Sequence, residues 1–326
     1  AVRDARDAAS PLWEMEYTEQ LRRKEVEMRG VVDRLARIGA KAGGVVACAP
    51  IACAPAGEHA LRNKLELAIG CDVDGQVCVG FRLGLGGSAF GEFLGPIADV
   101  PFVPRWMAAA AASLASALER VGHLAWKSLV LRGSEASSSG VAVLTRSEGA
   151  EDVEASHLCE ALVTAARAEG VALVSVLVRG AGGAEEEALP GGSGGVLEER
   201  LGGLRLRISA GAFFQVCTGA AEVLLRAVAD AVSAGGWPAL VIDACCGGGA
   251  IGLTIASAAS RAGAQTRVVG IELSEPSCAD AEVNAASNGL AGAFTLVRGK
   301  VEDRLPDVIA QHAPADGGVT VIVDPP

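Results

Sequence analysis

Hydrophobic positions along the chain recur with different periods, and each change of period marks a predicted element. Near the start, the spacing of apolar side chains predicts an amphipathic helix over Thr18–Ile38. Apolar and polar residues then alternate between Leu61 and Leu85, which predicts two strands joined by a hairpin turn at Asp74-Gly75. The small residues of Gly39–Gly57 predict a linker between these elements.

Helices and strands are mixed in the middle of the chain. The pattern predicts helices over Arg105–Val121 and Glu151–Ala168, and strands over Ser128–Arg132, Val141–Thr145 and Ala172–Val178. We therefore expect an α+β, strand-rich unit in this part of the chain.

The pattern changes near Ser209. Before this residue, composition predicts a flexible loop over Gly180–Gly195, and Val196–Ile208 is predicted to form a hairpin around Gly202-Gly203. From Ala210 onward, helical and strand patterns alternate, which is typical of a doubly wound α/β sheet.

Composition favours a folded protein with more than one unit. The chain has 326 residues, of which 50% are hydrophobic and 21% charged, so it can bury a sizeable core. Its net charge of −11 argues against a nucleic-acid partner. Basic residues nevertheless cluster at Leu21–Lys24, Arg62–Lys64 and Leu204–Arg207, where solvated surface is an equally good interpretation.

The nine cysteines do not form the pattern of a disulfide scaffold or a zinc site. Cys48 and Cys53 have ligand-like spacing, but no second pair or nearby histidine completes a metal site, so we expect no metal. The Ala-rich run Met107–Leu118 is too short to span a membrane, and we expect no membrane partner. Reduced thiols at Cys245-Cys246 suit an intracellular protein, in the cytoplasm or nucleus.

A glycine-rich turn is the most informative motif. The predicted strand Leu240–Ile242 leads through Asp243 to Gly247-Gly248-Gly249, and a helix is predicted from Ala250. The next strand, Arg267–Leu273, carries Glu272 near its end, 25 residues after Gly247. Glycines there allow close approach of a ligand, and the acid can accept hydrogen bonds from ribose hydroxyls. Because the glycines do not follow the dinucleotide spacing, the motif favours a nucleoside without a pyrophosphate, such as S-adenosylmethionine; an ordinary Gly-rich turn is the alternative.

Polar residues elsewhere in the last third also fall at predicted element ends. Gln215 follows Phe213-Phe214, which we expect to be buried, and precedes the predicted helix Thr218–Ser233. The strand Val319–Val323 delivers Asp324-Pro325-Pro326 at its carboxyl end, where open α/β sheets bind ligands.

Two further polar pairs are open to a structural or a functional interpretation. Asn284 lies in the predicted helix after Glu272, and Asn288-Gly289 lies at the end of that helix; the structural interpretation of these residues is a C-cap and turn. Glu302 and Asp303, in a predicted loop after the strand Phe294–Val297, either approach the adenine or are ordinary surface carboxylates.

These segments together resemble the RNA (uracil-5)-methyltransferase family, and most of all its eukaryotic tRNA branch. The residues that carry the resemblance are Ile208–Leu225, Asp243–Leu253, Gly270–Leu290, Arg298–Pro306 and Val321–Pro326, with weaker similarity at Tyr17–Lys24, Leu61–Gly70, Val79–Gly84 and Val196–Ser209. Leu61 stands where the family usually has Tyr, and Cys217 where it usually has Asn.

The resemblance implies a Rossmann-like S-adenosylmethionine methyltransferase domain, C-terminally incomplete, over residues 210–326. It would follow an α+β, strand-rich, RNA-facing subdomain over residues 58–209 and an N-terminal helix and linker over residues 1–57. Gln215, Glu272 and Asp324 match the family's cofactor contacts, with Cys245 and Gly247 in the glycine loop. Arg62 and Lys64 would bind RNA, and the implied partner is tRNA, bound by a monomer.

The family's reaction implies residues that this chain does not supply. A Cys thiolate attacks C6 of a uracil taken out of its stack, C5 then accepts the methyl group, and a general base removes the C5 proton. That Cys and the basic Glu follow D-P-P in the family, so we expect both to lie after Pro326. Cys217, Cys245 and Cys246 occupy other motifs.

Three other functions stay open from the sequence. A methyltransferase for ribosomal RNA uridine often carries an iron–sulfur cluster on four cysteines, for which Cys48 and Cys53 are too few. An amino- or amide-methylating enzyme would use D-P-P without a catalytic Cys. A non-catalytic RNA-binding module would not need the intact glycine loop.

Overall fold

The computed structural model describes residue 12, residues 14–41, residue 52, and residues 62–83, 93–150, 155–180, 182–315 and 318–325. Cys48, Cys53, Leu61 and Pro326 lie outside the described residues, as does nearly all of the predicted linker. The predicted N-terminal helix is confirmed as α2 (Tyr17–Lys41), most of whose described side chains are exposed.

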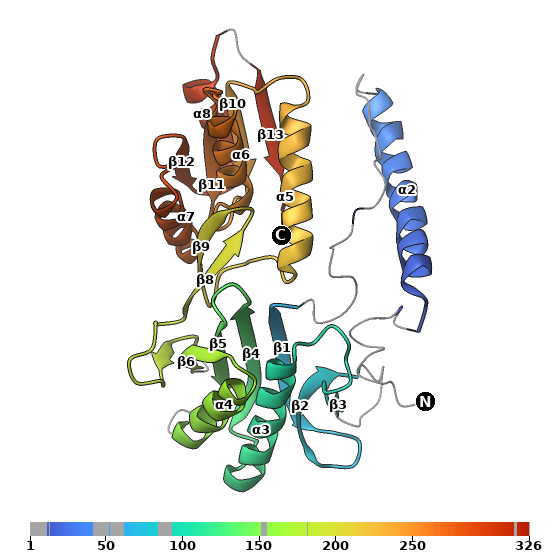
Figure 1. Cartoon of the computed structure of the whole chain (residues 1–326), viewed down its shortest axis with the longest axis vertical. Helices are drawn as coiled ribbons and strands as arrows, with labels where there is room; N and C mark the ends of the chain where they lie inside the picture. Colours follow the sequence, from blue (N-terminus) through green and yellow to red (C-terminus); the bar gives the residue numbers. More distant parts are fainter. Residues whose placement is uncertain are drawn as a thin grey trace.

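A seven-stranded sheet forms the first large unit of the fold (Figure 1). Its strands follow the order β3-β2-β1-β4-β5-β6-β7 and are antiparallel except for the parallel pair β5–β6. The elements are β1 (Lys64–Cys71), β2 (Val77–Arg82), β3 (Leu94–Gly95), β4 (Trp126–Ser134), β5 (Ser139–Arg146), β6 (Ala172–Arg179), β7 (Glu185–Glu187), α3 (Arg105–Val121) and α4 (Ser156–Ala168). Apolar side chains of both helices share one core with the sheet, which confirms the expected α+β, strand-rich character of this region.

A hairpin lies between this sheet and the second one (Figure 1). Its strands are β8 (Val196–Leu201) and β9 (Leu204–Ser209), as predicted. Gly202 and Gly203 both have positive φ, 59° and 85°, which suits a tight two-residue hairpin turn. Along each strand the buried residues alternate with exposed ones, so one face packs against the protein while the other meets solvent.

The second large unit is a parallel sheet of the Rossmann-like type, with the order β12-β11-β10-β13. Its elements are α5 (Thr218–Ser233), β10 (Leu240–Ala244), α6 (Ala250–Arg261), β11 (Arg267–Glu272), α7 (Glu275–Ser287), β12 (Phe294–Arg298), α8 (Val301–His312) and β13 (Val319–Val323). Leu240 and Ile242 of β10 pack toward Val308 of α8, whereas Val241 packs toward Leu253 of α6. Helices thus cover both faces, and the predicted doubly wound sheet is confirmed.

Two glycines allow the layers of this unit to approach closely. A Cβ on Gly270 of β11 would lie 2.7 Å from Cys246 Sγ and 2.7 Å from Phe294 Cζ. A Cβ on Gly252 of α6 would lie 2.9 Å from Phe294 Cε2. The Phe294 ring therefore fills space that any larger residue at either position would occupy.

Two segments differ from the sequence prediction. Within the predicted loop Gly180–Gly195, strand β7 forms because the Glu187 carboxylate accepts hydrogen bonds from the Val176 and Leu189 N–H groups, both at 3.0 Å, and from Gly194 N–H at 3.1 Å. Glu302 and Asp303 lie in the first turn of α8 rather than in a loop. Carboxylates in the first turn of a helix interact favourably with the positive end of the helix dipole. The sequence analysis did not predict that a helix begins here.

Candidate functional site

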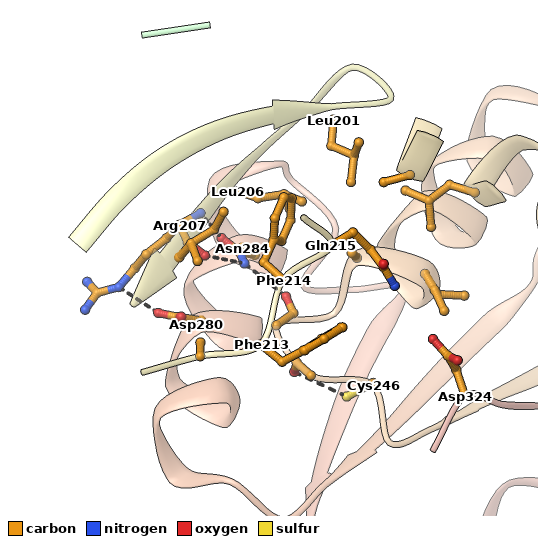
Figure 2. A pocket seen from close by; sticks show the side chains of 18 of the residues that line it. Leu201, Leu206, Arg207, Phe213, Phe214, Gln215, Cys246, Asp280, Asn284 and Asp324 are labelled. Atoms are coloured by element: carbon orange, nitrogen blue, oxygen red, sulfur yellow. Dashed lines mark hydrogen bonds and ion pairs between the residues drawn. The ribbon is translucent and has the colours of Figure 1, made fainter. Parts of the chain in front are cut away.

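Four of the five predicted cofactor-contacting residues line a single pocket. Gln215, Cys245, Gly247 and Asp324 meet there, at the carboxyl ends of β10 and β13. Figure 2 shows Gln215 and Asp324 among the side chains that line it. Apolar side chains form much of the remaining wall, namely Leu201, Leu206, Ile208, Phe214, Leu225 and Ile251. The pocket is thus mostly apolar with a few convergent polar groups, as small-molecule sites generally are.

The glycine loop between β10 and α6 has a backbone that favours glycine. Gly247 and Gly249 have φ of 55° and 85°, in the left-handed region. Cys245 also has positive φ, 62°, although it carries a side chain. The Gly249 N–H donates to the Cys246 carbonyl at 2.9 Å, which closes the turn immediately before the helix.

Glu272 does not line the pocket but holds its glycine loop. One carboxylate oxygen accepts the Gly247 N–H at 2.8 Å. The other accepts the N–H groups of Leu273 and Ser274, at 2.8 Å and 2.7 Å. Because a carboxylate offers about four lone-pair directions, three are already used. A contact between Glu272 and a ribose therefore stays a prediction.

Asp243 is a buried carboxylate that the sequence did not identify as a site residue. One of its oxygens accepts the Gly252 N–H at 2.8 Å and so caps the first turn of α6. The other oxygen is buried and has no hydrogen-bond partner among the described residues. Burial above all, and then the charges of Asp324 and Glu272, raise the pKa of Asp243 to about 7.

The charges around the pocket favour a cationic ligand over an anionic one. Asp243, Glu272 and Asp324 lie near enough to one another for the charges of the latter two to raise the pKa of Asp243. Among the described lining residues only Arg207 is cationic, and its Nε is 3.0 Å from an Asp280 oxygen. No other lining cation is therefore present to pair with a pyrophosphate.

The two phenylalanines before Gln215 differ in their environment. Phe214 is buried, as expected, but Phe213 is 70% exposed although it lines the pocket. The expectation that both rings are buried is therefore wrong for Phe213. Only the Phe214 ring enters the core, whereas the exposed Phe213 ring is an aromatic side chain on the wall of the pocket (Figure 2).

The seven-stranded sheet holds the segment that carries Gln215. Asn63, just before β1, donates its side-chain amide to the Gln215 carbonyl and to Thr218 Oγ1, both at 2.9 Å. Its backbone N–H donates to the Val216 carbonyl at 2.8 Å. Buried Arg132 of β4 donates to the Ala212 carbonyl at 3.1 Å. Sequence reasoning missed both anchors because their partners are distant along the chain.

The predicted RNA contacts on either side of Asn63 have local partners. The Arg62 guanidinium lies 5.0 Å from the centre of the Phe102 ring. Lys64 forms an ion pair with Glu66. A role of either cation in RNA binding stays a prediction.

The thiols of the glycine loop are poorly suited to act as nucleophiles. Burial and the nearby carboxylates raise the pKa of Cys245, and burial raises the pKa of Cys246 much further. Thiolate, not thiol, is the reactive form. This agrees with the expectation that these cysteines do not attack the base.

Asn284 and Asn288 differ in what they contact. Asn288 is the C-cap residue of α7, as expected. Asn284 is buried, however, and its amide bonds β9 and the Gly248 carbonyl. Asn284 lies within α7, as expected, but its contacts with β9 and the glycine loop were not predicted.

The described residues contain no group of three or more His, Cys, Asp or Glu side chains arranged to hold a metal ion. In the same part of the chain, no helix has the length and apolarity needed to cross a membrane.

The parallel sheet, the glycine loop and the pocket at the strand ends together define a Rossmann-like domain of the methyltransferase class. The structure of a Pyrococcus abyssi tRNA (uracil-54, C5)-methyltransferase in complex with S-adenosyl-L-homocysteine superposes with a TM-score of 0.62, covering 97% of this chain and 69% of that chain at 20% identity. This likeness confirms the fold class.

In sequence, the chain is similar over its whole length to tRNA (uracil-5-)-methyltransferases. It is 31% identical to tRNA (uracil-5-)-methyltransferase homolog A of Mus musculus and 32% identical to that of Homo sapiens, covering 100% and 98% of this chain. It spans 57% and 55% of the length of these relatives. No protein-family model matches the chain. The resemblance noted from the motifs is thus confirmed.

Proposed function

We propose that the chain binds S-adenosylmethionine in the pocket of Figure 2 and forms part of an enzyme that methylates C5 of uridine in tRNA. The observation that carries the proposal is the meeting of Gln215, Gly247 and Asp324 in one pocket at the carboxyl ends of the parallel strands. The names of the relatives, which are tRNA (uracil-5-)-methyltransferases, support the choice of substrate.

The charges of the pocket fit this cofactor. When bound, S-adenosylmethionine supplies a methyl group activated by a positively charged sulfonium. Asp324 and Glu272 provide negative charge at and beside the pocket, and the lining cation Arg207 is paired with Asp280. A dinucleotide would instead place an anionic pyrophosphate in this acidic environment, which electrostatics disfavours.

Phe213 would receive the target base. Its exposed ring lines the pocket and lies close to Gln215 along the chain. Bases that are taken out of a stack are commonly held against aromatic side chains, which contribute about 1–3 kcal/mol per base.

The hairpin would contact the RNA backbone. Arg200 of β8 and Arg205 of β9 are cross-strand partners, and both are exposed. Neither guanidinium forms an ion pair with any described residue. Two positive charges placed directly opposite each other destabilise a hairpin. A phosphate between them would relieve this repulsion.

The nucleophile would come from elsewhere in the longer enzyme. The family reaction needs a Cys thiolate at C6 of the uracil and a base for the C5 proton, whereas the loop thiols Cys245 and Cys246 have raised pKa values. We therefore propose that this chain provides the cofactor pocket and part of the RNA surface. The Cys and Glu would lie in the part of the relatives that this chain does not span.

Incubation with tRNA and methyl-labelled S-adenosylmethionine tests both halves of the proposal. We expect the chain to bind the cofactor without forming 5-methyluridine. Label at uracil C5 made by these 326 residues alone would refute the assignment of the nucleophile to another segment. Absence of cofactor binding would refute the proposed function itself.

A further inference from the structure

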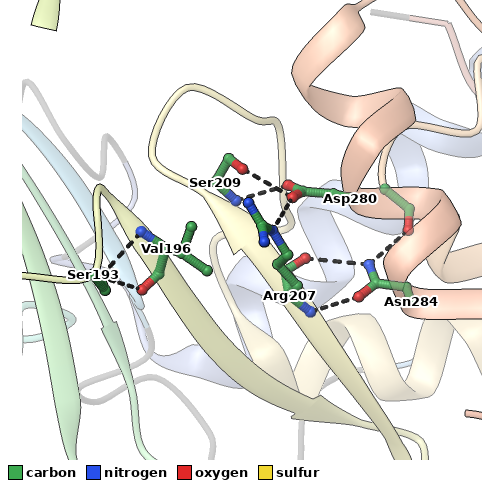
Figure 3. A network of polar contacts seen from close by, with 7 residues as sticks. Ser193, Val196, Arg207, Ser209, Asp280 and Asn284 are labelled. Carbon is green, nitrogen blue, oxygen red and sulfur yellow. Dashed lines mark hydrogen bonds and ion pairs between the residues drawn. The ribbon is translucent and has the colours of Figure 1, made fainter. Parts of the chain in front are cut away.

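A polar ladder joins helix α7 to strand β9 (Figure 3). Asp280 and Asn284 of α7 and its C-cap residue Asn288 are spaced four residues apart. They meet the backbone of Ser209, Arg207 and Arg205, which are spaced two apart on the strand. Asp280 accepts the Ser209 N–H at 2.7 Å, Asn284 accepts the Arg207 N–H at 2.6 Å, and Asn288 accepts the Arg205 N–H at 3.0 Å.

Elementary geometry explains the match. Four residues advance an α-helix by about 6 Å, and two residues advance a β-strand by about 6.6 Å. Side chains at every fourth helical position can therefore pair with successive outward-facing backbone groups of a strand edge. Both asparagines also return a hydrogen bond to the strand, Asn284 to the Arg207 carbonyl at 3.2 Å and Asn288 to the Arg205 carbonyl at 2.7 Å.

Asn284 has one contact that Asn288 lacks. Its side-chain N–H group also donates to the Gly248 carbonyl, at 3.0 Å, in the middle of the glycine loop. The corresponding group of Asn288 donates instead to the Asn284 carbonyl at 2.8 Å, within α7 itself. Asn284 is also the more enclosed residue, with 1% of its surface exposed.

The glycine loop is consequently held from two sides. Glu272, at the end of β11, accepts the Gly247 N–H at 2.8 Å, and Asn284 donates to the carbonyl of the next residue. Gly248, Asn284 and Asp280 all line the same pocket. An interaction at Asn284 therefore connects the β8–β9 hairpin directly to the backbone that shapes the pocket.

We infer that Asn284 is a positioning residue for the cofactor: its amide sets the orientation of the Gly248 peptide and couples that orientation to strand β9. This inference rests on the proposed function, because the ligand whose affinity it sets is S-adenosylmethionine. A ladder that only stabilised the fold would give Asn284 and Asn288 the same importance for binding.

An aspartate at either position makes a matched pair of variants. Asn284→Asp and Asn288→Asp each keep the oxygen that accepts a strand N–H, and each lose the N–H group that donates to carbonyls. Only Asn284→Asp places a carboxylate against the Gly248 carbonyl. Asn284→Ala removes the amide without adding charge and replaces the aspartate variant if that variant does not fold.

Calorimetric titration of the 326-residue chain with S-adenosylmethionine, together with thermal unfolding of each variant, is the test. We expect Asn284→Asp to lower the affinity at least tenfold at pH 8 and Asn288→Asp to change it less than twofold. At pH 5 part of the loss in Asn284→Asp should be recovered, because a protonated carboxyl can again donate to Gly248.

Two outcomes would overturn the inference, and they are distinguishable. If the unmodified chain binds the cofactor and both aspartate variants bind it equally well, Asn284 does not position the loop and the proposed function stands. If the unmodified chain does not bind, the proposed function fails and the inference fails with it.

Discussion

At the scale of single residues, Asp243 is a buried carboxyl group with a raised pKa. It is fully buried at the end of β10, it caps α6 through Gly252, and its pKa is raised to about 7. In the unfolded chain the value returns to about 3.8. Between pH 3.8 and about 7 the folded state binds more protons than the unfolded state. The contribution of Asp243 to stability is therefore fully present only below pH 3.8 and is lost as the pH rises toward 7.

We therefore predict that Asp243 makes the protein less stable as the pH rises from about 4 to 7, by on the order of 1 kcal/mol per pH unit. Asp243→Asn keeps an oxygen for the Gly252 N–H but cannot ionise, so this slope should vanish. Urea unfolding of both proteins at pH 4.5, 6 and 8 measures the pH dependence of each unfolding free energy. If the difference in unfolding free energy between the unmodified protein and Asp243→Asn does not change with pH, the prediction is contradicted.

Single residues also show how far the sequence could predict the site. Gln215, Gly247 and Asp324 could be identified because each lies in a motif next to a predicted strand or helix end. Asn63 and Asn284 could not, because their partners Gln215 and Arg207 are 152 and 77 residues away. For Glu272 the motif indicated the right region, but its hydrogen bonds to three backbone N–H groups depend on the loop geometry.

At the scale of elements, the hydrophobic periodicity predicted the long helices and strands. It did not predict the short strand β7 or the polar packing between α7 and β9. Helices α3 and α5 and strand β13 begin and end at the predicted residues. Strand β7 has three residues, which is too short to show a hydrophobic period, and it depends on the hydrogen bonds of Glu187. The buried face of α7 includes Ser277, Asp280 and Asn284, so a search for apolar stripes would not identify the face that packs on β9.

The packing of β11 against α6 and β12 makes a specific prediction. Gly270→Ala would place a methyl group 2.7 Å from both Cys246 Sγ and Phe294 Cζ, which is closer than real contacts allow. We expect a loss of about 1–3 kcal/mol in the free energy of unfolding. Gly211→Ala is the control, because a Cβ there has no atom within 4 Å. Equal stability of the two variants in denaturant titrations would show that Phe294 moves aside without cost.

At the scale of the whole molecule, the two sheets contribute to one pocket. The strand-rich sheet holds the Gln215 segment through Asn63 and Arg132, while the parallel sheet supplies the glycine loop and Asp324. The hairpin between them lines the pocket with Leu201, Leu206, Arg207 and Ile208. It also presents Arg200 and Arg205 to solvent. We propose that RNA binds to the local cations of this hairpin, although the chain as a whole has a net charge of −11.

We predict that reversing both exposed arginines, Arg200→Glu with Arg205→Glu, weakens tRNA binding at least tenfold and lowers its dependence on salt. Cofactor affinity should change little. Arg261→Glu, at the end of α6 farthest from the strand ends that form the pocket, is the matched control and should bind tRNA nearly as well as the unmodified chain. Fluorescence anisotropy at several salt concentrations measures the affinity for tRNA. An equal loss of tRNA affinity in the hairpin variant and in Arg261→Glu would refute a hairpin-specific contact.

The central claim is that the pocket at the ends of β10 and β13 binds S-adenosylmethionine, and calorimetric titration of the chain tests it most directly. The account predicts one bound cofactor per chain and no binding of NAD, whose pyrophosphate the acidic surroundings disfavour. It also predicts a loss of about 2–4 kcal/mol of binding free energy in Glu272→Ala, because the glycine loop loses its carboxylate anchor. Absence of cofactor binding, or affinity unchanged by Glu272→Ala, would contradict the account.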